Sequence, residues 1–197
     1  MRELVFLLEE ESAKAMLESF LPRILHPDIR PRFVSFEGKQ DLERQITKRL
    51  RGYVNPQARF IVLRDQDSAP DCLALKARLI ERCQQSGRHG RSLVRIACTE
   101  LETYYLADLR AVEQALKVKN LTRRQGSSKF RNPDRLGNPS KELDALTMGC
   151  YQKVSGSREI GKHLDPDNEC SPSFKNLVKG IRRMEIELLA LPGALCA

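Results

Sequence analysis

The 197-residue chain has no tryptophan, and only 6% of its residues are aromatic. Its six cysteines form no Cys-x-x-Cys pair, and no histidine stands at zinc-finger spacing from them, so neither a zinc site nor a disulfide framework is indicated. No apolar run approaches the roughly 20 residues that a membrane-spanning helix needs. We therefore expect a cytoplasmic chain with reduced thiols that folds on its hydrophobic core alone, away from membranes.

Several familiar functional motifs are also missing. No Gly-x-Gly-x-x-Gly follows a strand-like segment, and Gly-x-x-x-x-Gly-Lys-Ser/Thr does not occur, which argues against dinucleotide and P-loop binding. The three histidines, His26, His89 and His163, have no obvious triad partners in the sequence. Ser12 lies in no Gly-x-Ser-x-Gly elbow. Catalysis, if present, has to come from other side chains.

What the chain does contain is charge. Its formal net charge is +8 and 30% of its residues are charged, a balance that suits a polyanionic partner. Seven Lys or Arg stand between Lys117 and Arg135, against the single acid Asp134. This segment is either an ordinary solvated basic loop or a surface that follows a nucleic-acid backbone. The candidate phosphate contacts within it are Arg123, Arg124, Lys129 and Arg131.

Apolar runs too short for helices predict a buried sheet. Leu4–Leu8 and Phe60–Leu63 are unbroken runs of this kind, and residues 33–36 and 93–97 suggest two further strands. A helical pattern follows each strand: after Ser12, over residues 39–51, over about 71–85, and from Thr99 to Leu116. This alternation predicts an α/β fold with a parallel sheet of about four strands flanked by helices.

The ends of these elements can also be predicted. We expect Ser12 to cap the first helix, and capping boxes at Ser68/Asp71 and Thr99/Glu102 to start two others. Residues 22–31 have the composition of a loop. Beyond residue 118 the pattern predicts the basic loop, short helices over about 141–148 and within 151–162, and a last helix from Ser173 to about Leu191. We divide the chain into an α/β core over 1–118 and a helical C-terminal extension over 119–197.

Acidic residues follow three of the predicted strands. Glu9 follows the first, Asp65 and Asp67 the central one, and Glu100 and Glu102 the fourth. In a parallel sheet these positions meet at the carboxyl edge, where ligands bind. Paired carboxylates repel one another unless a cation lies between them, and Mg²⁺ prefers oxygen ligands. The alternative is that these acids only begin loops and cap helices, as Asp and Glu often do.

The order of these segments resembles a known family. Phe6-Leu-Leu-Glu9, Arg64-Asp-Gln-Asp67 and the stretch from Arg95 to Glu102 resemble the topoisomerase–primase (TOPRIM) domain and the overcoming-lysogenization-defect (OLD) nucleases. With Tyr105, Asp108 and the segments 130–134 and 151–156, the chain resembles in more detail a bacterial TOPRIM-like family, domain of unknown function 4276. One position departs from the TOPRIM pattern: Glu10 stands where Gly is usual, which leaves open whether Glu9 or Glu10 is the ligand.

The resemblance implies metal-assisted phosphodiester cleavage of DNA or RNA. It implies that Glu9, Asp65 and Asp67 hold Mg²⁺ or Mn²⁺, and that Glu100 or Glu102 completes a second metal site or acts as general base. By composition, Lys153, Arg158 and Lys162 are candidate phosphate contacts, or else ordinary surface charges.

Three functional hypotheses follow. The first is a nuclease, acting in phage defence with an ABC-type ATPase that this family is often encoded beside. The second is a non-catalytic TOPRIM-like subunit that docks on such an ATPase, for example through the segment Leu188–Ala197. The third is a phosphohydrolase that uses the same metal site on a small nucleotide.

Overall fold

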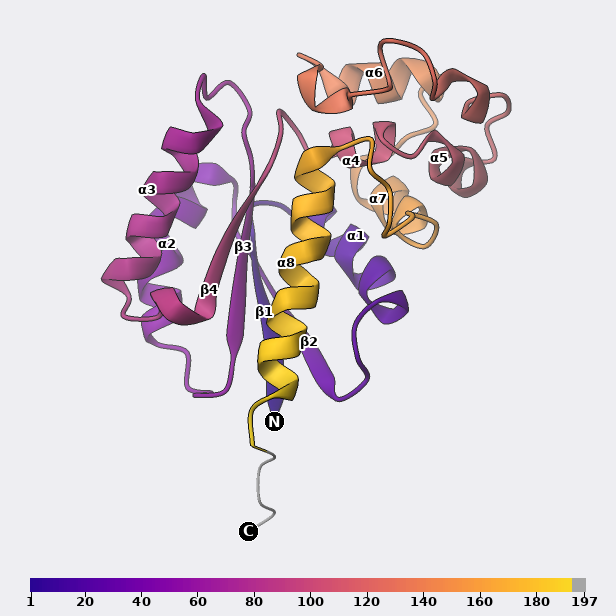
Figure 1. The fold of residues 1–197 in the computed structure, drawn as a ribbon. Coiled ribbons are helices and arrows are strands. Elements are labelled where there is room, and N and C mark those ends of the chain that lie inside the picture. Colours follow the sequence, from indigo (N-terminus) through magenta and orange to yellow (C-terminus); the bar gives the residue numbers. More distant parts are fainter. Residues whose placement is uncertain (193–197) are drawn as a thin grey trace.

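The computed structural model describes residues 1–192, and within them the four predicted strands form one parallel sheet (Figure 1). The strands are β1 (Arg2–Leu8), β2 (Ile29–Ser35), β3 (Arg59–Asp65) and β4 (Ser92–Ala97), in the order β2-β1-β3-β4. The two unbroken apolar runs form the central strands β1 and β3, which are buried on both faces. The α/β fold predicted from the alternation of patterns is confirmed.

Helices cover both faces of the sheet. They are α1 (Glu11–Phe20), α2 (Lys39–Arg51), α3 (Cys72–Gln85), α4 (Glu102–Leu106), α5 (Leu109–Leu116), α6 (Pro139–Leu146), α7 (Lys153–Gly161) and α8 (Pro172–Leu189). Short 3-10 helices lie at Leu21–Arg23, His89–Arg91, Thr122–Arg124 and Pro133–Arg135. Helices α2 and α3 pack on one face, and α8 lies along the other beside α1 (Figure 1). None of the helices within residues 1–192 has both the length and the apolarity needed to cross a membrane.

Alternating strand residues feed two separate hydrophobic cores. On the α2–α3 face, Val5, Leu7 and Val62 pack with helix residues such as Ile46 and Leu79. On the opposite face the core is larger and contains strand residues together with residues of α1, α4, α5, α7 and α8; its members include Leu4, Phe6, Ile61, Met16, Tyr104, Ile160 and Leu177. A strand residue's position in the alternation therefore decides which helical layer it meets.

Strand β2 begins earlier than the sequence indicated. Residues 22–31 have the composition of a loop, yet β2 starts at Ile29 and pairs with β1 from Arg2↔Ile29 to Leu8↔Ser35. Pro31 is tolerated because β2 is an edge strand, where a missing N–H costs no ladder hydrogen bond on the open side. The loop prediction was wrong for residues 29–31.

The three predicted caps were also wrong. Helix α1 starts at Glu11, and Ser12 donates its hydroxyl to the Glu10 carboxylate (3.2 Å) rather than capping the helix. Helix α3 is capped by Asp71, whose carboxylate accepts the Leu73 amide (2.7 Å), and not by Ser68. Thr99 caps no helix, because its backbone is left-handed (φ 64°).

The helix predicted from Thr99 to Leu116 is two helices. Helix α4 ends at Leu106, and Asp108 caps α5 by accepting the Ala111 amide (3.0 Å). The second carboxylate oxygen of Asp108 accepts the Asp165 amide (2.8 Å) from the loop after α7. Asp108 therefore breaks the helix and ties the break to a distant loop.

Helix α7 packs closely against α1 through glycine. A Cβ on Gly161 would lie 2.5 Å from the Met16 carbonyl oxygen, so this contact admits no side chain.

The domain division at residue 118 stays a prediction. Of the segment 188–197, Leu188 is buried in α8, and residues 193–197 lie outside the described part of the chain.

Candidate active site

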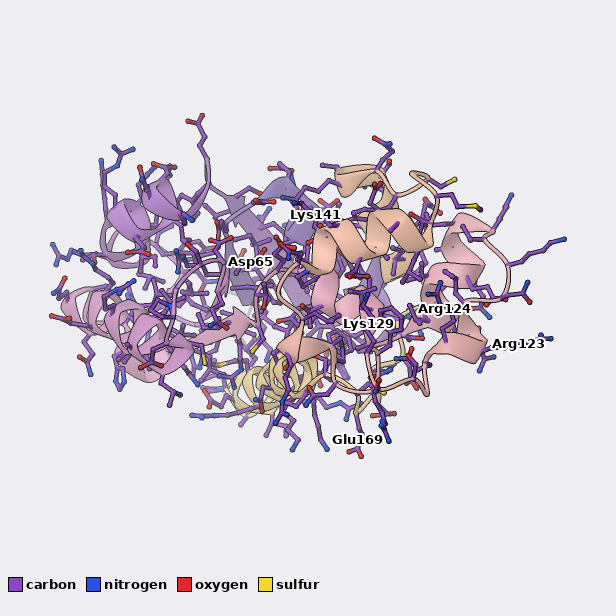
Figure 2. All side chains as sticks on the ribbon, turned by 90° about the horizontal axis from the view of Figure 1, so that it is seen from above. Asp65, Arg123, Arg124, Lys129, Lys141 and Glu169 are labelled. Carbon is purple, nitrogen blue, oxygen red and sulfur yellow. The ribbon has the colours of Figure 1, made fainter. Side chains whose placement is uncertain are left out.

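The loops that follow β1 and β3 meet at the carboxyl edge of the sheet. The registers Leu8↔Leu63 and Asp65↔Ala97 place the three strand ends beside one another. The buried Glu9 side chain accepts the Asp65 backbone amide through Oε2 (3.2 Å). Figure 2, which looks down on this edge, shows Asp65 near the middle of the molecule. Sequence-distant acids are thus adjacent, as the parallel sheet requires.

Asp67 turns toward a lysine. Its backbone is left-handed (φ 52°), a conformation that Asp tolerates better than most residues. Its Oδ2 pairs with Nζ of Lys39, at the first position of α2, at 3.1 Å. The Asp67 carboxylate is therefore engaged by a cation that comes from another element.

Backbone hydrogen bonds join the loops after β3 and β4. The Gln66 amide donates to the Ala97 carbonyl (2.9 Å) and the Asp67 amide to the Thr99 carbonyl (2.7 Å). Thr99 is left-handed, which is an outlier for a β-branched residue and costs about 1–3 kcal/mol. Such strain is typical of functional sites, and here it brings the Asp67 and Glu100 loops together.

Glu102 lies at the first position of α4 and is buried. Tyr151 donates its hydroxyl to Glu102 Oε1 (2.9 Å), and Ser157 Oγ contacts the same hydroxyl (3.1 Å). A Cβ on Gly156 would lie 2.6 Å from the Tyr151 ring, so glycine at this position lets the ring approach. The segment 151–156 that carries part of the family resemblance thus positions Glu102.

Glu100 has a structural partner instead. Its Oε2 accepts the Ser140 amide (2.7 Å) in the first turn of α6. A carboxylate at a helix N-terminus satisfies a free amide and interacts favourably with the helix dipole. Of the two acids proposed to assist at this edge, Glu102 is the one that faces the other carboxylates.

The carboxylates of this edge raise one another's pKa values. Burial, together with the charges of Glu9 and Glu102, raises the pKa of Asp65 well above its usual range, although part of the residue is exposed. Burial and the nearby Asp67 raise the pKa of Glu9. Burial also raises the pKa of Glu102. Negative charge is therefore concentrated at this edge, and Arg64, whose Nε lies 3.8 Å from Glu9 Oε2, offsets part of it.

Among the predicted phosphate contacts, Lys153, the first residue of α7, is the one whose charge interacts with these acids. It pairs with Glu10 Oε2 (2.5 Å). Burial would lower the pKa of Lys153, but Glu10, Glu102 and Asp65 outweigh it and raise that pKa, so the ammonium stays charged. Glu10, which stands where the TOPRIM pattern has glycine, thus pairs with Lys153, whereas Glu9 contacts Asp65.

A cavity of about 320 Å³ opens beside Glu102. Lys153 and Lys141 line it together with Tyr151 and Ser140. Figure 2 shows Lys141 on α6 close to Asp65 in this view. The sequence patterns did not indicate Lys141 as a site residue. A lysine in the first turn of a short helix belongs to no motif that would predict a ligand contact.

The other predicted phosphate contacts lie elsewhere. Arg158 pairs with Glu18 (3.2 Å) and Lys162 with Glu159 (2.6 Å), both on the exposed side of the α1–α7 layer. Arg124 and Lys129 lie over the Phe130 ring, at 5.9 and 5.8 Å from its centroid. In Figure 2, Arg123 and Arg124 stand at the far rim from Asp65. Arg131, in the same basic segment, is exposed. The part of this segment that holds Arg123 and Arg124 therefore does not line the acidic edge.

The donor set at this edge fits a hard divalent cation, because it consists of carboxylate oxygens from three strand ends. Within residues 1–192, however, no three acids, histidines or cysteines already stand close enough together to hold one ion. Asp67, paired with Lys39, is the predicted ligand whose side chain is engaged away from the others. Metal binding at Glu9, Asp65 and Asp67 requires these side chains to come closer together.

Comparisons with known proteins agree with the sequence motifs. The family model described as "Domain of unknown function (DUF4276)" matches residues 8–182. The fold is similar to the C-terminal region of the Burkholderia pseudomallei OLD protein, with a TM-score of 0.55 and 16% identity over 92% of this chain and 98% of that one. No curated protein matches the chain. Because the family model spans most of its length, including Glu9, Asp65 and Glu102, the chain belongs to the DUF4276 family and has its TOPRIM-like fold.

Proposed function

We propose that the chain is a divalent-metal-dependent nuclease that hydrolyses phosphodiester bonds of DNA or RNA. The observation that carries this proposal is the meeting of Glu9, Asp65 and Glu102 at one edge of the sheet. Burial raises the pKa of all three carboxyl groups, and the charges of Glu9 and Glu102 add to the shift of Asp65, so a cation bound at this edge would be favourable. A cavity lined by Glu102, Asp144 and two lysines opens beside this edge.

Glu9, Asp65 and Asp67 would hold Mg²⁺ or Mn²⁺. When bound, the ion polarises a phosphoryl oxygen and lowers the pKa of a coordinated water. For Asp67 to take part, its carboxylate, which pairs with Lys39 through Oδ2, has to approach Glu9 and Asp65, and this residue is only partly buried. The backbone of the site stays in place during this change, because hydrogen bonds between main-chain atoms hold both loops.

The other side chains supply positioning and charge. Lys153 and Lys141, on the wall of the cavity, are placed to contact the non-bridging oxygens of a phosphate and the charge that develops on them. Glu102, fixed by the Tyr151 hydroxyl, is placed to accept a proton beside the same cavity. This assigns the supporting acid role to Glu102 rather than Glu100.

Nicking of supercoiled plasmid and cleavage of labelled RNA, each with Mg²⁺ or Mn²⁺, test the proposal. We expect Asp65→Ala to lose at least about 100-fold in rate, whereas Asp28→Ala, an exposed acid before β2, leaves the rate unchanged. Equal activity of the wild type and Asp65→Ala would remove the nuclease proposal. Turnover of nucleotides without cleavage of either polymer would favour the small-substrate phosphohydrolase.

The proposal includes a partner, an ABC-type ATPase, and a role in phage defence. Its support is the family resemblance alone. Co-expression with an ABC-type ATPase, followed by affinity purification and nuclease assay, tests it. A complex without metal-dependent cleavage, and without a metal-induced rise in Tm, would favour the non-catalytic subunit.

A further inference from the structure

A second cavity, of about 440 Å³, lies between α2 and α3. Its lining is strongly basic: Lys39, Gln40, Glu43, Arg44, Arg64 and Arg82. Four cationic side chains thus face one carboxylate. We call this cavity the arginine pocket. It lies on the opposite face of the sheet from Asp65, because β3 alternates and Arg64 immediately precedes Asp65.

Arg64 is the centre of the arginine pocket. The residue is 5% exposed, and two of its guanidinium nitrogens, Nε and Nη1, are buried without a hydrogen-bond partner. Its ion-pair contacts are long: 3.8 Å from Nε to Glu9 and 3.4 Å from Nη2 to Glu43. Buried guanidinium groups normally have their donors satisfied, so this side chain is prepared for an acceptor that has several oxygens.

The other cations of the pocket are available to the same ligand. The Arg44 side chain is 78% exposed, and its contact is with Asp41 one turn earlier in α2. Arg82, on α3, is exposed. Lys39 lines the pocket and at the same time pairs with Asp67, so it connects the pocket to the acidic edge.

We infer that the arginine pocket binds a phosphate group of the nucleic-acid strand, on the same strand as the phosphate that is cleaved at the acidic edge. The inference rests on the proposed function and adds a second phosphate subsite to it. Phosphate fits because its tetrahedral oxygens accept from the fork of Arg64 while Arg44, Arg82 and Lys39 supply charge. In Figure 2, Asp65 lies between the α2–α3 side and Lys141, so a strand that occupies both cavities crosses the acids.

Binding without catalysis isolates this inference. The probe is a fluorescein-labelled 20-nucleotide single strand, DNA or RNA, titrated in EDTA so that no cleavage occurs. We expect Arg44→Ala/Arg82→Ala to weaken binding about tenfold at 0.1 M salt. We also expect the slope of log K against log salt to become less steep by about 0.7 for each phosphate that the variant no longer neutralises. The matched control is Arg49→Ala/Arg51→Ala, on the last turn of α2 and outside the pocket, which removes the same charge.

Inorganic phosphate distinguishes a polymer from a small ligand. We expect millimolar phosphate to raise the Tm of the wild type and of the control, and this shift to fall at least about fivefold in Arg64→Lys, which keeps the charge but loses the planar fork. A phosphate shift that depends on the pocket, with unchanged oligonucleotide binding, would keep the phosphate subsite and assign it to a small phosphorylated molecule.

The inference is overturned if Arg44→Ala/Arg82→Ala and the control bind the oligonucleotide equally and phosphate shifts neither Tm. Arg44 and Arg82 are exposed, so the double variant keeps the test valid even if Arg64→Lys does not fold. If the pocket does not bind phosphate, the wild type still nicks plasmid and the proposed function stands. If the wild type does not nick plasmid but the pocket binds, only the proposed function is rejected.

Discussion

Asp67 Oδ2 lies 3.1 Å from Lys39 Nζ, so the first residue of α2 holds a carboxylate that follows β3. This pair joins two regions of opposite charge: the acidic edge and the arginine pocket. A divalent cation at the proposed site would compete with Lys39 for the charge of this carboxylate.

Removal of this competition should tighten cation binding. We expect Lys39→Met to bind Mn²⁺ about three- to tenfold more tightly, because a positive charge near the metal position is removed. Electron paramagnetic resonance of free Mn²⁺ measures the affinity. Lys48→Met, an exposed lysine on the same helix, serves as the charge-matched control. A Lys39→Met affinity equal to that of the control would show that Asp67 is not a ligand.

The buried charge of Asp65 should make metal-free stability depend on pH. Since the folded state raises the pKa of Asp65, its ionisation opposes folding: the contribution is most favourable below the unfolded pKa and is lost as pH rises through the folded value. At pH 7 without metal, Asp65→Asn should therefore be more stable than wild type. The gain should shrink as pH falls toward 4.

Calorimetry in EDTA measures this effect. In a chain of this size, each kcal/mol gained corresponds to a Tm rise of about 2–4 °C. Addition of Mg²⁺ should reverse the order, because it stabilises only the wild type. A variant that is less stable than wild type at pH 7 in EDTA would contradict the placement of Asp65 among uncompensated acids.

Tyr151 should matter through Glu102. Loss of its hydroxyl in Tyr151→Phe leaves the buried Glu102 carboxylate without that donor and should cost about 1–3 kcal/mol of stability. Cleavage should fall as well, if Glu102 is held for catalysis. A double-mutant cycle with Glu102→Gln tests the pairing, since coupled residues give non-additive losses. Additive effects on stability and rate would mean that Tyr151 acts elsewhere.

The glycine contact between α7 and α1 should tolerate no side chain. We expect Gly161→Ala to destabilise the fold by about 2–4 kcal/mol, because its Cβ would meet the rigid Met16 carbonyl at 2.5 Å. Urea denaturation measures the loss. Gly126→Ala, whose Cβ would meet no atom within 4 Å, is the control and should change stability by less than about 0.5 kcal/mol. Equal stability of the two variants would contradict this packing.

The sheet and its acidic edge were predictable because both depend on local patterns. The runs at Leu4–Leu8 and Phe60–Leu63 specify strands, and parallel strand ends bring Glu9 and Asp65 together without further information. Helix boundaries were less predictable. Thr99 has the sequence of a cap, but its backbone is left-handed and its carbonyl accepts the Asp67 amide from another loop, so tertiary contacts replace the local preference.

The cationic side of the site could not be predicted in the same way. Lys39 and Arg82 belong to different helices and meet only when α2 packs on α3. The basic segment around Arg123 gave the stronger sequence signal but lies at the far rim (Figure 2). One signal was available: Arg64 is a lone charge that continues a buried strand, and the alternation places it opposite Asp65.

The main-chain bonds from Gln66 to Ala97 and from Asp67 to Thr99 extend the ladder past the last strand residues. These two bonds join main-chain atoms and do not involve the side chains of Asp65 and Asp67, whereas the Asp65 carboxylate also accepts the Leu101 amide at 3.0 Å. A replacement at Asp67, or Asp65→Asn, which keeps an oxygen that can accept the Leu101 amide, should therefore report on chemistry rather than on collapse of the loops. The same frame offers protein engineers a place to exchange the ligands of the proposed metal site.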